Sequence, residues 1–170
     1  MHEGLVDLAT KGLVTLYPRK GTVVNDYRRD GSMELLVSLF LHTQGTLDPK
    51  LLSSILQMRL LIEIEIARLC ALSRTTEDKK AVLEILKEER DMHLLFPEEI
   101  AVIDYKFHHA LALASGNTVY PLLMNSLKPL YLGILNRFYA DKSVVAEVQR
   151  WHRRIASAIF AGLEIGRAHV

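Results

Sequence analysis

The spacing of apolar residues constrains the fold of this chain most strongly. From Ser32 onward, apolar side chains recur every three or four positions, which is the period of an amphipathic α-helix with one face turned to a core. Turn-forming residues divide the pattern into six segments with short connections, which begin near residues 33, 49, 76, 97, 118 and 143. Six helices joined by short loops predict an all-α antiparallel bundle.

Capping residues and prolines mark the boundaries of these segments. Asp48 followed by Pro49 is typical of an N-cap and a first helical turn. Ser143 is suited to cap the last helix. Pro129 lies inside the fifth segment and removes a backbone donor there, so we expect that helix, over residues 118–139, to be kinked. The third segment predicts one helix from Thr76 to Met92.

The N-terminal part of the chain follows another pattern. Residues 1–11 have helical spacing, and two apolar runs at 13–17 and 22–24 surround a turn, which predicts a small β-hairpin. The hairpin tip carries Arg19 and Lys20. A hairpin with a basic tip beside a helix is typical of the wing of a winged helix-turn-helix, whose cations contact DNA phosphates. An ordinary solvated turn is the alternative.

Composition limits the other possibilities. Of the 170 residues, 49% are hydrophobic, 9 are Gly and 5 are Pro, which favours one sizeable core over disorder. The net charge of +1 gives no general attraction to nucleic acid. One cysteine, no signal peptide and no long charge-free apolar run predict a soluble, cytoplasmic protein with no membrane partner.

A candidate metal site lies in the fourth predicted helix. Asp104 and His108 are four residues apart and therefore project from one face of that helix. His152, on the last helix, can turn toward the same interior edge. One carboxylate and two imidazoles suit a divalent ion such as zinc, nickel, manganese or iron. The alternative is that these are core residues with ordinary internal partners.

Three further residues are candidates for effector binding. Arg59 is unusual in a largely apolar helix, and its planar fork can bind a carboxylate with two hydrogen bonds. Glu63, one turn later, is an equally good internal partner for it. Tyr131 and Asn136 can line a ligand cavity, although aromatic residues at helical spacing are more often part of the core.

Several motifs together resemble the GntR family of transcriptional regulators, and in particular its FadR branch with an all-helical, FCD-type effector domain. They are Leu13-Val14 with residues 18–24, Arg59 with Glu63, residues 104–108, residues 114–117, Leu130-Tyr131, and His152. The resemblance implies a homodimeric regulator whose affinity for operator DNA changes when a small molecule binds the helical domain. It adds Asn117 to the candidate effector-binding residues.

The resemblance also bears on the metal. In many relatives, one Asp and three His hold a divalent metal that contacts a carboxylate effector, and Asp104, His108 and His152 match the first three positions. The best-known member of the FadR branch senses long-chain acyl-CoA and lacks the first of these histidines. His108 therefore favours the metal-bearing type. The fourth ligand is expected on one more helix beyond the end of this chain.

Both ends of the chain affect its interpretation. Residues 164–170 read as the translation of a sequencing adapter, so we interpret His169 in this tail as non-native. We expect a chain truncated at both ends, in which a partial winged helix-turn-helix at 1–27 precedes a helical effector-binding domain at 28–163.

These features lead to one predicted function and two alternatives. The prediction is a ligand-responsive DNA-binding regulator, not an enzyme, that senses a small carboxylate in a metal-containing helical domain. An acyl-CoA sensor without metal would keep the fold and change the effector. A metal-dependent helical-bundle enzyme has less support, because the sequence has no Glu-x-x-His pair, HExxH motif or nucleophile elbow.

Overall fold

The structure is a computed structural model that describes residues 2–43 and 47–161. The predicted all-α class is confirmed, because these residues are mostly helical and contain one two-stranded sheet. The chain divides into two compact units, residues 1–47 and 48–170, which we describe separately. The tail at 164–170, with His169, lies outside the described residues.

The first unit has a helix and a hairpin, followed by two more helices. Its elements are α1 (His2–Thr10), β1 (Val14–Tyr17), β2 (Gly21–Val24), α2 (Tyr27–Asp30) and α3 (Met33–His42). The strands pair antiparallel, as the sequence predicts. Our sequence interpretation grouped α3 with the helical domain from residue 28 onward, whereas in the structure α3 belongs to the first unit.

Glycine allows the tight connection between α1 and β1. Gly12 has a φ of +79°, which L side chains rarely adopt, and a Cβ atom there would collide with the backbone of Asp30. The side-chain amide of Asn25 donates to the Gly12 carbonyl at 3.2 Å. Arg19 and Lys20 lie exposed at the hairpin tip.

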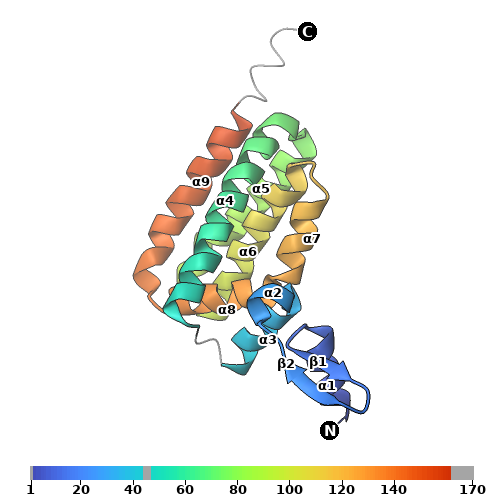
Figure 1. Cartoon of the computed structure of the whole chain (residues 1–170). Helices are drawn as coiled ribbons and strands as arrows, with labels where there is room; N and C mark the ends of the chain where they lie inside the picture. The colour runs from blue at the N-terminus through green and yellow to red at the C-terminus, as the bar shows by residue number, and fades with distance from the viewer. Residues whose placement is uncertain (1, 44–46, 162–170) are drawn as a thin grey trace. The chain divides into compact units, whose positions relative to one another are not determined.

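The second unit contains most of the helices and the core (Figure 1). Its α-helices are α4 (Pro49–Ser73), α5 (Thr76–Glu88), α6 (Pro97–Ala114), α7 (Val119–Ser126), α8 (Lys128–Phe138) and α9 (Val145–Phe160), with 3₁₀ turns η1 (Glu89–Leu94) and η2 (Lys142–Val144). The Asp48 side chain caps α4, as predicted. In the described ranges, no helix is long and apolar enough to cross a membrane.

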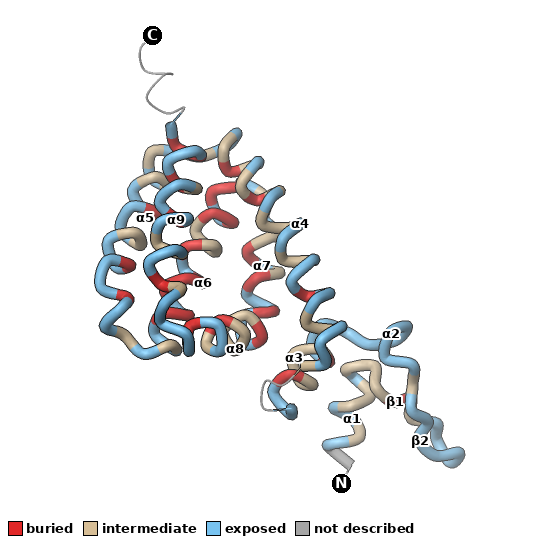
Figure 2. The backbone as a smooth tube through the Cα atoms, turned by 90° about the vertical axis from the view of Figure 1, so that its left-hand side faces the viewer, coloured by how far each residue is buried: buried red, intermediate tan, exposed pale blue. Residues whose placement is uncertain are grey.

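The core is organised around α6. This helix packs against α4, α5, α7 and α8, and buried residues lie along its length (Figure 2). Phe107 and Leu111 belong to one buried apolar cluster, and Ile100 and Ile103 belong to a second. Because α6 contributes to both clusters, the side chains of residues 100–114 pack against several neighbouring helices.

Three predicted helix boundaries are wrong, each for a local reason. The expected single helix over 118–139 is two helices that meet at Leu127, because Pro129 cannot donate to the carbonyl four residues earlier. The third predicted helix is α5, which ends at Glu88, and the chain continues as the 3₁₀ turn η1. Before α9, Asp141 caps η2 by accepting hydrogen bonds from Ser143, so Ser143 is not the cap.

Candidate metal and effector site

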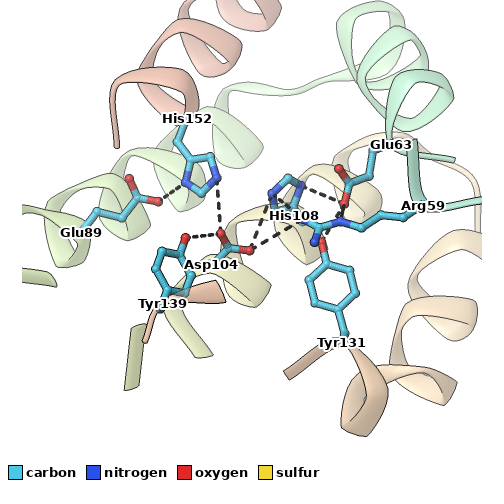
Figure 3. A network of polar contacts seen from close by, with 8 residues as sticks. All are labelled: Arg59, Glu63, Glu89, Asp104, His108, Tyr131, Tyr139 and His152. Atoms are coloured by element: carbon cyan, nitrogen blue, oxygen red, sulfur yellow. Dashed lines mark hydrogen bonds and ion pairs between the residues drawn. The ribbon is translucent and has the colours of Figure 1, made fainter. Parts of the chain in front are cut away.

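Asp104, His108 and His152 come together inside the second unit (Figure 3). Asp104 and His108 lie one turn apart on α6, and His152 faces them from α9. One ligand atom from each residue lies within 4.8 Å of the other two. Nε2 of His108 is 3.8 Å from Oδ1 of Asp104, and Nε2 of His152 is 3.8 Å from Oδ2. The juxtaposition expected from helical spacing is therefore present.

The carboxylate of Asp104 is buried and only partly satisfied. Its side chain is 4% exposed, and Oδ2 accepts a hydrogen bond from the Tyr139 hydroxyl at 2.6 Å. Oδ1 has no hydrogen-bond partner among the described residues. Burial, together with the charge of Asp104, raises the pKa of Tyr139. A buried carboxylate oxygen without a partner is costly, so this atom fits a position that a cation would occupy.

Each histidine has a glutamate carboxylate next to its Nδ1 atom. Nδ1 of His152 lies 2.6 Å from Oε1 of Glu89, and Nδ1 of His108 lies 3.4 Å from Oε1 of Glu63. An ionised carboxylate only accepts hydrogen bonds, so it favours the tautomer with the proton on Nδ1. Nε2 is then free to bind a metal, which is the usual arrangement of a carboxylate–histidine–metal site.

Sequence reasoning missed Glu89. This residue is fully buried on η1, within a strongly charged stretch of the sequence. A signal was available, because Glu89 is seven residues after Val82 and continues the apolar stripe of Val82 and Leu86. An acidic residue at a core position of a predicted helix indicates a buried partner.

Arg59 connects the site to α4. Its Nε donates to Glu63 Oε1 at 2.6 Å, so the internal pairing considered from the sequence exists. The same guanidinium also faces the metal candidates, with Nη2 3.5 Å from His108 Nε2 and 3.9 Å from Asp104 Oδ1. It lies 4.2 Å above the ring of Tyr131, whose hydroxyl donates to Glu63 at 2.6 Å.

The charges of this cluster do not balance within the protein. Burial lowers the pKa of His108, which favours the neutral imidazole. If His152 is neutral as well, the ionised forms of Glu63, Glu89 and Asp104 put three negative charges into this cluster, and among its described residues Arg59 carries one positive charge. Three negative charges against one positive charge leave an excess of two. A divalent cation would remove this excess, which is expensive to bury.

The two candidate asparagines make no hydrogen bond to this cluster among the described residues. The Asn117 side chain accepts the backbone N–H of Val119 at 2.9 Å and so helps to start α7. Asn136 lies partly buried on α8, three residues before Tyr139. Across the described ranges, no hydrogen bond or ion pair connects either side chain to Arg59 or to Asp104. Their effector-binding role stays a prediction.

Comparison with known proteins places these features in a family. An FCD domain model matches residues 54–164. The fatty acid metabolism regulator protein of Klebsiella pneumoniae subsp. pneumoniae is 28% identical over 163 residues, with 96% of this chain and 66% of that protein aligned. The HTH-type transcriptional regulator LutR of Bacillus subtilis is 30% identical, with 95% of this chain and 74% of that protein aligned.

A solved structure supports the same fold. Streptococcus agalactiae GntR superposes with a TM-score of 0.58 at 23% identity, covering 93% of this chain and 69% of that chain. The chain spans just under two thirds of the length of the fatty acid metabolism regulators that it matches. On the match to the FCD model and to these relatives, the chain belongs to the FCD-domain group of GntR-family transcriptional regulators.

Proposed function

We propose that this chain is the sensing part of a transcriptional regulator, in which a small carboxylate binds beside a divalent metal and changes the affinity for operator DNA. The observation that carries the proposal is the convergence of Asp104, His108 and His152 next to the Arg59 guanidinium. These three residues would hold the metal, which is zinc, nickel or manganese by the chemistry of the donor set. When bound, the metal supplies open coordination positions for an anion.

The protein's own residues complete the anion site. Nη2 of Arg59 lies 3.5 Å from Nε2 of His108, so a carboxylate bound near His108 would also contact the Arg59 guanidinium. Tyr131 lies under the guanidinium and limits its movement. Glu63 holds Nε of Arg59 and Nδ1 of His108 at the same time. Recognition of an anion therefore involves α4, α6 and α8 together.

Regulation would follow from this link between helices. A ligand that contacts Arg59 on α4 and the metal on α6 and α9 favours the arrangement of helices in which both contacts form. We propose that the protein acts in the cytoplasm as a homodimer, and that Arg19 and Lys20 at the hairpin tip contact DNA phosphates. The relatives are named as regulators, which supports a role without catalysis.

Metal binding to purified, chelator-treated protein tests the first half of the proposal. We expect Zn²⁺ to raise the melting temperature of the wild type, and Asp104→Ala to abolish the rise, because the site forms only in the folded state. Asp91→Ala removes an exposed carboxylate outside the site and serves as the control. A melting temperature that is the same with metal and with chelator would count against the proposal.

Effector binding tests the second half. We expect Arg59→Ala to remove carboxylate binding while metal affinity changes little, and equal loss of both would mean that Arg59 is structural. The fatty acid metabolism regulators among the relatives support the alternative of acyl-CoA sensing without metal. Tight binding of a long-chain acyl-CoA by metal-free protein would favour that alternative.

A further inference from the structure

We infer that the effector carries a short aliphatic tail, and that an apolar cavity between α4, α7 and α8 binds this tail. The inference rests on the proposed carboxylate site and specifies which carboxylates it selects. The cavity has a volume of about 50 Å³.

The walls of the cavity are apolar apart from three residues. Ile62 and Ile66 of α4, Leu123 and Met124 of α7, and Leu130 and Ile134 of α8 form much of the lining. The polar residues that line it are those of the proposed anion site, namely Arg59, Glu63 and Tyr131. A pocket with mostly apolar walls and a few polar groups is the usual form of a small-molecule site.

Arg59 fixes how a ligand would lie. The Arg59 side chain lines the cavity, and its Nη2 lies 3.9 Å from Oδ1 of Asp104, so this one side chain borders both the apolar space and the metal candidates. A molecule whose carboxylate binds Arg59 can extend the rest of its structure only into solvent or into the cavity. The apolar lining favours the second position for an aliphatic tail and disfavours it for a polar one.

The volume sets the length of the tail. A water-sized group requires about 10–15 Å³ of such space, so the cavity has room for about three to five carbon atoms. Each buried methylene is worth about 0.8 kcal/mol, which corresponds to about a fourfold gain in affinity. Linear carboxylates should therefore bind more tightly with each added carbon up to about hexanoate, and octanoate should bind no more tightly than hexanoate.

A chain-length series measured by calorimetry on the Zn²⁺-loaded protein tests this inference. The ligands are acetate, propanoate, butanoate, pentanoate, hexanoate and octanoate. Leu123→Phe fills the cavity and should weaken hexanoate binding at least tenfold while acetate binding stays within twofold. Leu123→Ala enlarges the cavity and should move the optimum to longer acids.

The neighbouring residue gives a matched control. Leu122 lies on the same helix and is 64% exposed, so Leu122→Phe and Leu122→Ala should leave the series unchanged. Circular dichroism checks the fold of each variant, and Ile134→Phe on α8 replaces Leu123→Phe if that variant does not fold. Equal effects from Leu122 and Leu123 variants would overturn the inference.

The remaining outcomes separate this inference from the proposed function. If carboxylates bind through Arg59 with the same affinity at every length, the proposed function stands and the tail site is wrong. If no carboxylate in the series binds, the proposed function itself fails. If affinity still rises at octanoate, the short tail is excluded, because the cavity must then open to a longer chain.

Discussion

Glu89 provides the sharpest test of how the candidate metal site is built. Its carboxylate is fully buried and lies 2.6 Å from Nδ1 of His152, so its removal should disturb the orientation and charge of that imidazole while all three metal candidates stay in place. We expect Glu89→Gln to weaken Zn²⁺ binding about tenfold, at the lower end of the usual cost for such partners, because the amide oxygen can still accept the hydrogen bond. Glu89→Ala removes the acceptor and should cost about 100-fold.

The magnitude converts directly into a thermal shift. A tenfold loss of affinity at a fixed excess of metal lowers the stabilisation by about 1.4 kcal/mol. For a protein of this length, this corresponds to about 3–6 °C in the metal-induced rise of the melting temperature. Glu89→Gln should therefore reduce the Zn²⁺-induced rise of the melting temperature by about 3–6 °C. The melting temperature of the metal-free protein should change less than this.

The assay is a competition titration with a chromophoric chelator, together with thermal melting with and without Zn²⁺. Glu88→Gln is the control, because it makes the same change of charge one residue away, on an exposed side chain paired with Lys106 at 2.7 Å. Nitrogen NMR should show the proton of His152 on Nδ1 in the wild type. Unchanged Zn²⁺ affinity in Glu89→Gln, or an equal loss in Glu88→Gln, would refute the reasoning.

Three other predictions concern the core and the polar cluster. Phe107→Ala should destabilise the protein by about 3–5 kcal/mol in urea unfolding, because this side chain is fully buried, and a cost below 1 kcal/mol would show that the core repacks. Burial raises the pKa of the Cys70 thiol to about 11, so it should resist thiol reagents at pH 8 until urea unfolds the chain. Burial opposes ionisation of Glu63, yet the Arg59 charge and the hydrogen bond from Tyr131 lower its pKa below 4.5, so stability should fall as the pH drops below that value. Glu63→Gln should flatten this acid limb of the stability curve.

The features of the fold and of the site that could be predicted from the sequence are those that follow from local geometry. Four residues of separation bring Asp104 and His108 to one face of a helix whatever surrounds them, and the apolar stripe of α9 turns His152 inward. The hairpin was predictable for the same reason, because its turn and β-branched residues act locally. The short-range pattern therefore accounts for the fold class and for the positions of the metal candidates.

Features that depend on distant partners were not predictable in this way. Glu89 follows the apolar stripe of Val82 and Leu86, which marks its position as inward-facing, but the sequence does not identify its partner His152 on α9. Pro129 was expected to bend one helix, but the chain ends α7 and begins α8 at this point. The Asn117 side chain accepts the backbone N–H of Val119 at the start of α7, and its effector-binding role stays a prediction.

The length of α4 has a mechanical consequence. This helix begins at Pro49, directly after the boundary between the two units, and continues for 25 residues, or about 37 Å. Arg59 lies about 15 Å from its first residue, at 1.5 Å per residue. A continuous helix bends little, so a ligand that tilted α4 at Arg59 would also displace Pro49, the end of α4 that follows the first unit in the chain.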